Sequence, residues 1–263
     1  KDYLGSVQAV DDGVGRILDY LEEAGLSENT IVIYSSDQGF YLGEHGWYDK
    51  RWMFEESLEM PFVIRWPGRI DAGVRSEALI QNIDYAPTFL QAAGMEVPEA
   101  IQGRSLLPVL QGECQAPADW RDSIYYAYYE NDAVHNVPEH DGVRTDRYKL
   151  IFFPRTNSWN LFDLEEDPQE MQSVHDDPAY AEVLAGMQKR YRDQRDFYAV
   201  NSAVIPETRG DLPAWKKREN LLKKRVKEAT ADSKLAFIGD SIKQGWEGRG
   251  RRVWQNRYQQ RRA

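Results

Sequence analysis

The sequence predicts an α/β fold followed by a C-terminal segment of different composition. Residues 31–34 (Ile-Val-Ile-Tyr) form a short β-branched run that predicts a buried strand. Polar residues that suit a site at the end of that strand follow at once. Before it, apolar residues recur at steps of three and four, which predicts an amphipathic helix. These residues are Tyr3, Val7, Val10, Val14, Ile17, Leu18 and Leu21.

Turn residues between apolar runs place the remaining elements. We expect strands at 62–66, 123–129 and 148–153, with residues 142–147 as a turn that makes the last two an antiparallel hairpin. A helix over 84–93 is supported by Pro87 in its first turn and Gly94 after its end. A long helix is expected over 178–197.

The composition limits the class of protein. The 263 residues include 8 Trp and 15 Tyr, which is typical of a chain with a packed core and not of a disordered one. No apolar run approaches the roughly 20 residues of a membrane span, so none is predicted. The first residue is Lys1 with no signal peptide after it, and we expect a fragment whose N-terminus lies upstream.

Charge divides the chain near residue 208. The net charge is −10, but the part from Arg209 onward carries about +10 and the part before it about −20. Residues 201–232 are therefore predicted to be a linker and a basic helix, and a strand is expected at 235–238. The acidic body argues against nucleic-acid binding.

The most informative chemistry is Ser36-Asp37-Gln38-Gly39, followed by Lys50. An acid and an amide at the mouth of a strand offer two oxygen ligands to a hard divalent ion such as calcium. A lysine beside that ion suits a tetrahedral oxyanion whose charge grows during group transfer. Taken alone, Asp-Gln-Gly after a strand is more typical of a turn with a capping Asp.

Many short segments together resemble the type I sulfatases, in unbroken order over residues 1–200. The resemblance implies the C-terminal part of an alkaline-phosphatase-like fold with a smaller C-terminal α+β subdomain. It also implies one bound calcium ion and the hydrolysis of sulfate esters. The segments are 10–15, 24–26, 29–32, 37–50, 55–57, 60–62, 84–88, 102–106, 142–145, 148–150, 161–164 and 167–168.

The same resemblance implies roles for individual residues. Asp37 and Gln38 correspond to calcium ligands, although many relatives have Asn or His at the second position. Lys50 corresponds to a lysine that contacts the sulfate. His45 is a candidate for substrate contact or for protonation of the leaving oxygen, and alternatively only orders its loop. His140 is either a contact to the organic part of the substrate or an ordinary loop residue.

The family's nucleophile is a formylglycine made from Cys or Ser in a Cys/Ser-x-Pro/Ala-x-Arg motif. The single cysteine, Cys114, does not match it, because Ala118 stands where the arginine is needed. The nucleophile is therefore expected upstream of Lys1, and residues 1–263 alone are predicted to be inactive. The resemblance further implies a periplasmic or secreted protein.

Near the C-terminus, Gly239-Asp240-Ser241-Ile242 follows the expected strand. Such a sequence presents a nucleophile in α/β esterases, and is also a common turn. With residues 244–247 and 253–254 it resembles the first block of the SGNH hydrolases, which implies a truncated SGNH domain over 233–263 with Ser241 as nucleophile.

The sequence thus predicts a sulfatase fused to an acyl or carbohydrate esterase, and the pairing suggests a sulfated polysaccharide as substrate. One alternative is a phosphodiester or phosphonate hydrolase, because the same type of metal site accepts phosphoryl groups. Another is a catalytically incomplete fragment. The natural substrate and the oligomeric state do not follow from the sequence.

Overall fold

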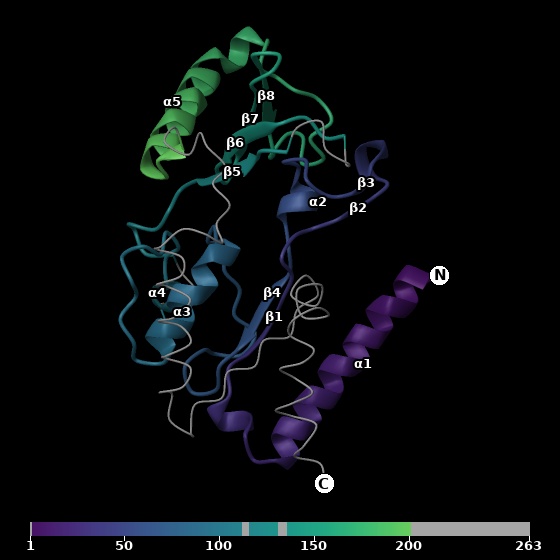
Figure 1. Ribbon diagram of the computed structural model, residues 1–263, viewed down its shortest axis with the longest axis vertical. Coiled ribbons are helices and arrows are strands. Elements are labelled where there is room, and N and C mark those ends of the chain that lie inside the picture. Colours follow the sequence, from purple (N-terminus) through teal and green to yellow (C-terminus); the bar gives the residue numbers. More distant parts are fainter. Residues whose placement is uncertain (1, 112–115, 131–135, 201–263) are drawn as a thin grey trace, which may run out of the picture. The chain divides into compact units, whose positions relative to one another are not determined.

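The computed structural model describes residues 2–111, 116–130 and 136–200 (Figure 1). The chain divides into two compact units, 1–194 and 195–263, and the first holds almost all of the described residues. The predicted linker, basic helix, last strand and Ser241, like Cys114, lie outside the described residues. Among the helices that are described, none has the length and apolar character needed to cross a membrane.

Helix α1 (Asp2–Glu23) forms where the apolar periodicity predicts it. Gly25, with φ of 65°, ends it in a left-handed turn, and a 3₁₀ turn follows at Ser27–Asn29. No residue of the helix is buried, and Tyr3 and Val7 are about half exposed. The periodicity therefore predicts the helix correctly, while its apolar face has no cover within the described residues.

Strand β1 (Val32–Ser35) pairs antiparallel with β4 (Phe62–Arg65), with Val32 opposite Arg65. Both strands are near their predicted positions, but β1 is only half-buried and its partner is antiparallel. Helix α3 (Tyr85–Ala92) packs beside the pair. The ring of Tyr85 stacks on Phe62 at 5.4 Å, and its hydroxyl lies 2.7 Å from that of Ser35. Helix α3 thereby fixes the end of β1.

A buried carboxylate explains two of the segments singled out in the sequence. Asp84, in the 3₁₀ turn Asn82–Asp84 before α3, is fully buried and forms a bidentate ion pair with Arg121. It also accepts the backbone N–H groups of Gln81 and Arg104, each at 2.8 Å. Segments 84–88 and 102–106 therefore meet at a structural centre, next to the short helix α4 (Leu107–Gln111).

The segment between β1 and β4 forms four short elements. Strands β2 (Tyr41–Leu42) and β3 (Tyr48–Asp49) pair antiparallel around a 3₁₀ turn at Glu44–Gly46. Helix α2 (Glu55–Leu58) follows them. One hydrophobic cluster joins this segment to the sheet described next, through Tyr41, Met53, Phe54, Ile151 and Phe162.

A four-stranded antiparallel sheet has the order β5-β6-β7-β8. Its strands are β5 (Ile124–Tyr128), β6 (His140–Arg144), β7 (Tyr148–Phe153) and β8 (Ser158–Asp163). The predicted hairpin between 123–129 and 148–153 is wrong, because β6 lies between these strands. The sequence does not predict β6, because Gly142 is a residue typical of turns and stands in the middle of this strand. The glycine is needed there, because a Cβ would lie 2.3 Å from the carbonyl oxygen of Leu150.

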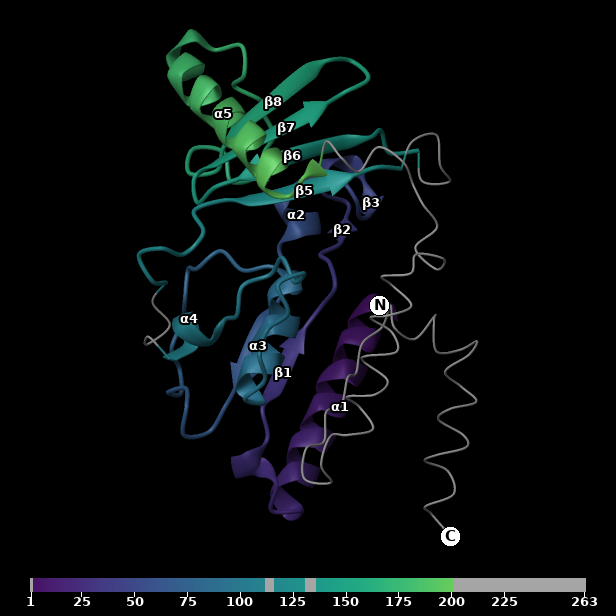
Figure 2. The same cartoon turned by 60° about the vertical axis from the view of Figure 1, so that its left-hand side comes forward.

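Helix α5 (Ala181–Phe197), after a 3₁₀ turn at Pro178–Tyr180, covers one face of this sheet (Figure 2). Its Met187 and Tyr191 pack against Val143, Leu150 and Leu161. The Tyr191 hydroxyl also donates to buried Asp141 at 2.8 Å. The helix predicted over 178–197 is confirmed.

Candidate active site

Asp37 and Gln38 follow β1 directly, as predicted. Asp37 is exposed and Gln38 is half-buried. The Gln38 amide nitrogen donates to the hydroxyl of Ser57 at 3.0 Å. Because the nitrogen donates to Ser57, the amide oxygen is the atom of this side chain that can serve as a ligand for a cation.

Gly39 lets this loop approach α2 closely. Its N–H donates to the carbonyl oxygen of Ser57 at 2.9 Å. A Cβ at this position would lie 2.1 Å from the carbonyl oxygen of Glu56, nearer than any side-chain carbon can come. The glycine is therefore required by the contact with α2.

Lys50 lies on a strained turn after β3. Its neighbours Asp49 and Arg51 have φ angles of 92° and 102°, which non-glycine residues rarely adopt. Their side chains form an ion pair with each other, and the backbone N–H of Arg51 donates to the Ser57 hydroxyl at 3.1 Å. Strain of this kind persists where the surroundings hold it, often at functional sites. The Ser57 hydroxyl therefore accepts hydrogen bonds from both segments of the predicted site, from Gln38 in one and from Arg51 beside Lys50 in the other.

A hollow of about 370 Å³ adjoins Lys50. Its walls combine aromatic rings with charged side chains, and the rings of Trp47 and Trp52 stack at 4.5 Å. Such walls suit a sugar ring that carries an anionic group, because aromatic faces pack on apolar ring faces and charges bind the substituents. The lining residues are Tyr41, Gly46, Trp47, Tyr48, Asp49, Lys50, Arg51, Trp52, Asn136 and Val137.

His45 belongs to the same segment, in the 3₁₀ turn between β2 and β3. Its φ is 54°, and its Nε2 lies 3.3 Å from the carboxylate of Glu56 in α2. Its ring stacks on Phe54 at 4.5 Å. These contacts fix the imidazole and order the loop. They also supply the carboxylate partner that a proton-transferring histidine needs.

His140 is the first residue of strand β6. Its side chain has no exposed surface, and its Nδ1 lies 2.8 Å from the carbonyl oxygen of Pro138. Its ring lies 5.3 Å from Trp52 and is surrounded by further aromatic rings, and burial lowers its pKa. This geometry supports a packing role and does not support contact with a substrate. The surrounding rings also include Tyr126, Tyr128 and Phe153.

Helix α2 is anchored by buried charges. The Nζ of Lys149, which is fully buried, lies 2.7 Å from the carboxylates of both Glu55 and Glu170. Arg144 pairs with Glu55 at 3.0 Å, and Glu170 accepts the Glu55 backbone N–H at 2.7 Å. Burial tends to raise the pKa of Glu55, but the two cations outweigh it and hold that pKa below its usual range. For Glu170, burial prevails and raises the pKa.

Sequence reasoning assigned no role to this charge cluster or to Ser57. The segment 55–57 was noted only as part of a family resemblance. The partners of Glu55 are about 90 residues or more away, at Arg144, Lys149 and Glu170, and no periodicity connects them. An acid pair followed by a serine on so short a helix gives no local signal of what each side chain contacts.

The described residues can hold only part of a calcium site. Asp37 and Gln38 supply two oxygen donors of a type that calcium accepts, whereas calcium takes about six to eight. Within residues 2–111, 116–130 and 136–200, no group of three or more His, Cys, Asp or Glu side chains is arranged around a common point. The donor chemistry fits calcium, and the remaining ligands are expected elsewhere.

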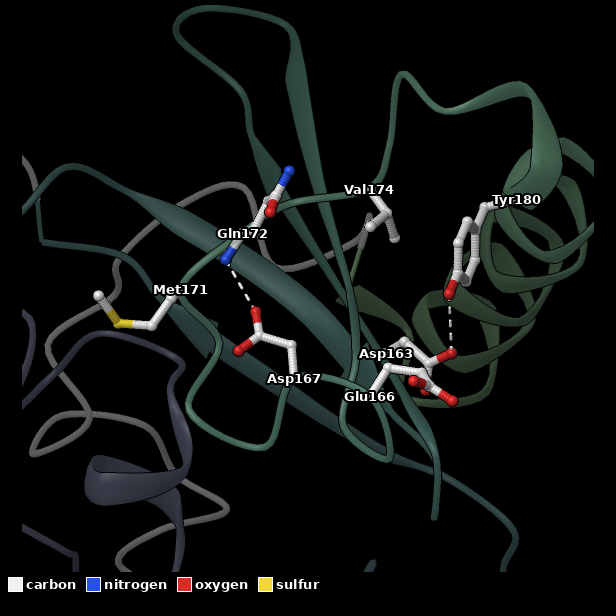
Figure 3. Close-up of a pocket in the computed structure, with 7 residues that line it drawn as sticks. All are labelled: Asp163, Glu166, Asp167, Met171, Gln172, Val174 and Tyr180. Atoms are coloured by element: carbon white, nitrogen blue, oxygen red, sulfur yellow. Dashed lines mark hydrogen bonds between the residues drawn. The ribbon is translucent and has the colours of Figure 1, made fainter.

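A second hollow, of about 350 Å³, follows strand β8 (Figure 3). Two of its three acidic residues are hydrogen-bonded: Tyr180 donates to Asp163 at 3.2 Å, and the Gln172 backbone N–H donates to Asp167 at 2.8 Å. Asp163 is also paired with Arg147, which holds the pKa of that carboxyl below its usual range. Segment 161–168 therefore holds the end of β8 and the turn that follows it.

Comparison with known families decides the assignment. Residues 43–196, more than half of the chain, match the model of the family described as "N-sulphoglucosamine sulphohydrolase, C-terminal". The chain belongs to this sulfatase family. It is 50% identical over 201 residues to the N-acetylglucosamine-6-O-sulfatase of Bacteroides thetaiotaomicron, a match that covers 73% of this chain and 36% of the relative.

Solved structures show the same sulfatase fold. One, determined in complex with its substrate D-glucosamine-2-N,6-O-disulfate, is 47% identical with a TM-score of 0.75, over 78% of this chain and 42% of that one. Another, the phosphonate monoester hydrolase of Agrobacterium radiobacter, is 29% identical with a TM-score of 0.66, over 74% and 40%. The chain therefore spans about two fifths of the length of these relatives, and its mixed α/β architecture corresponds to the C-terminal part of the alkaline-phosphatase-like fold.

Proposed function

We propose that the protein is a sulfuric ester hydrolase that acts on a sulfated amino sugar. The observation that carries this proposal is the hollow beside Lys50, held against the Asp37–Gln38 loop through Ser57. The 50% identity to an N-acetylglucosamine-6-O-sulfatase supports the amino sugar as substrate class. A sulfated polysaccharide that contains this sugar is the proposed natural partner.

In the proposed site, Asp37 and Gln38 hold a calcium ion, which when bound supplies Lewis-acid polarisation of the sulfate oxygens. The ammonium group of Lys50 binds a sulfate oxygen and stabilises the charge that grows during transfer. His45, oriented by Glu56 at 3.3 Å, protonates the leaving sugar oxygen. The nucleophile, a formylglycine by family resemblance, is expected outside this chain.

The sugar is proposed to occupy the hollow. Trp47 and Trp52 offer aromatic surface, while the paired Asp49 and Arg51 offer an acceptor and donors for ring hydroxyl or amine substituents. A small aryl sulfate needs only the sulfate contacts and would leave most of these groups unused. The site thus separates recognition of the sulfate from recognition of the sugar.

A second candidate is phosphonate monoester hydrolysis. The 29% identity and TM-score of 0.66 with the phosphonate monoester hydrolase favour it, and a cation with a lysine also stabilises a phosphoryl group. The amino-sugar hydrolase is preferred because the relative that bears that name has the higher identity.

The test uses the full-length protein and compares sulfated N-acetylglucosamine, an aryl sulfate and a phenyl phosphonate. We expect the sulfated sugar to be the best substrate by kcat/KM. Asp37→Ala and Lys50→Ala should each lower kcat/KM by about 100-fold or more, a loss typical of a charged group that acts on the transition state. Lys189→Ala, on the exposed side of α5, is the control. Near-normal turnover by both site variants, or a preference for the phosphonate, would contradict the proposal.

Two further expectations stay proposals. Residues 233–263 are proposed to begin an SGNH hydrolase domain with Ser241 as nucleophile, and the protein is proposed to act in the periplasm or outside the cell. Acetyl-ester hydrolysis by the full-length protein that Ser241→Ala abolishes would support the first. Cell fractionation tests the second.

Purified residues 1–263 should turn over neither sulfate esters nor acyl esters, because no formylglycine motif is present.

A further inference from the structure

We infer that Ser57 is a positioning residue of the proposed sulfate ester site, an inference that rests on the proposed function. Its side chain is 1% exposed, so it contacts no substrate. Its Oγ accepts the amide N–H of Gln38 at 3.0 Å and the backbone N–H of Arg51 at 3.1 Å. One hydroxyl thereby holds a proposed cation ligand and the turn that carries Lys50.

The backbone of Ser57 adds a third bond, because its carbonyl oxygen accepts the N–H of Gly39 at 2.9 Å. Three hydrogen bonds from two separate loops therefore end on one residue. A hydroxyl has two acceptor lone pairs, and both are used here. An aliphatic side chain at this position would remove the acceptor of two part-buried N–H groups.

Ser57 can position these loops because its own helix is fixed. Glu55 is held by buried Lys149 and by Arg144, and the backbone N–H of Glu55 donates to Glu170 at 2.7 Å. These bonds join α2 to β6, to β7 and to Glu170 in the segment after β8, independently of the two loops. The sheet therefore fixes α2, and Ser57 on α2 in turn fixes the loop of Gln38 and the turn of Lys50.

Removal of the Ser57 hydroxyl should leave the Gln38 amide and the turn at Lys50 no longer aligned with each other. Without it, the Gln38 amide is free to rotate, and its oxygen no longer keeps one orientation toward the cation. The Arg51 N–H also loses its acceptor, which removes one of the bonds that hold the strained turn at Lys50, while the bond from the Tyr126 hydroxyl to the Arg51 carbonyl oxygen remains. Ser57→Ala should therefore weaken calcium binding and lower kcat, with little change in KM for a small substrate.

The experiment uses the full-length protein in wild-type form and as Ser57→Ala, Ser57→Cys and Ser57→Thr. Calcium affinity is measured by titration calorimetry without substrate, and kcat and KM are measured with an aryl sulfate. We expect Ser57→Ala to lose about 10-fold or more in both calcium affinity and kcat, as for removal of a partner that orients a metal ligand. Ser57→Thr, which keeps the oxygen, should recover most of the loss. Ser57→Cys, a weak acceptor of similar shape, should resemble Ser57→Ala.

Ser123→Ala is the matched control. Ser123 is 2% exposed, and its hydroxyl accepts Gln194 at 3.0 Å, remote in the sequence from both loops. It should lower thermal stability without changing calcium affinity or kcat more than about twofold.

Ser57→Ala or Ser57→Cys with wild-type calcium affinity and kcat would overturn the inference, and if only one of them folds, that one decides. Wild-type protein that turns over no sulfate ester contradicts the proposed function, while the calcium titration still decides the role of Ser57. Wild-type protein that binds no calcium overturns the part that concerns Gln38.

Discussion

The buried amine of Lys149 lies 2.7 Å from the carboxylate of Glu55 at the start of α2. Removal of one partner from such a pair leaves an uncompensated charge inside the protein. We therefore expect Lys149→Met to lower the free energy of unfolding by about 3–5 kcal/mol. Urea unfolding of the full-length protein, followed by Trp fluorescence, measures this change.

Lys189→Met is the control for that experiment, because Lys189 forms an exposed pair with Asp193 one turn along α5. Exposed pairs of this type contribute about 0.5 kcal/mol or less. Equal stability of the Lys149 and Lys189 variants would show that the buried cluster does not hold α2.

A second prediction concerns pH and His140. Burial lowers the pKa of His140, so the folded protein favours the neutral ring. Its contribution to stability is complete above the unfolded pKa of about 6.5 and is lost as the pH falls from there through the folded pKa. His140→Phe, which keeps a ring in the aromatic cluster, should make unfolding less sensitive to acid between pH 8 and pH 5.

The same variant separates packing from catalysis. Because the ring is fully buried, we expect His140→Phe to keep kcat/KM for the sulfated sugar within about threefold, the range of small packing changes. His175→Gln, which removes a histidine at a partly exposed site, is the matched control. A collapse of activity in folded His140→Phe would instead favour the substrate contact that the sequence leaves open as one of two alternatives.

The third prediction concerns Gly39. A Cβ there would meet the backbone of Glu56 at 2.1 Å, and backbone cannot swing aside as a side chain can. Gly39→Ala should therefore displace the Asp37–Gln38 loop and lower kcat by about 100-fold or more, as misplacement of catalytic groups by about 1 Å does. Kinetics and calcium titration both measure it.

Gly13→Ala is the matched control, because Gly13 lies inside α1 with open space around its Cβ position. Alanine in a helix interior is favoured over glycine by about 0.5–1 kcal/mol. This variant should match or exceed wild-type stability with normal kcat, and a comparable loss in both variants would contradict the role given to Gly39.

The fourth prediction separates the sugar from the sulfate. Asp49→Asn weakens the ion pair with Arg51 and removes an anionic acceptor from the hollow beside Lys50. We expect KM for sulfated N-acetylglucosamine to rise by about 10-fold, which is the size of one charged hydrogen bond. The aryl sulfate should be affected by less than threefold. Equal losses on both substrates would place Asp49 with the sulfate instead.

The sequence predicted elements whose signal is local. The periodicity of α1, the apolar runs of β1 and β7, and the helix over 178–197 were all found within a few residues. It failed at β6, because Gly142 is a turn former whose presence there is explained only by a close contact with Leu150 from the neighbouring strand. Strand propensity cannot show a contact that the fold itself creates.

The same limit applies to the candidate site. Asp37 and Lys50 stand out because their chemistry is unusual beside a strand. Ser57 does not, since serine is a common residue and its three hydrogen bonds depend on loops brought together by folding. The sequence leaves His140 as either a substrate contact or a loop residue, because its aromatic surroundings come from four separate positions along the chain.

The anchoring of α2 also dictates an order of events during synthesis. Segments 37–50 and 55–58 leave the ribosome before Arg144, Lys149 and Glu170, which follow Glu55 by about 90 to 115 residues. Contacts across such a separation form only after a long loop has closed. The proposed site therefore cannot take its final geometry on the nascent chain until the sheet has emerged and paired, and a truncation inside β7 would leave the loops at Gln38 and Lys50 unorganised.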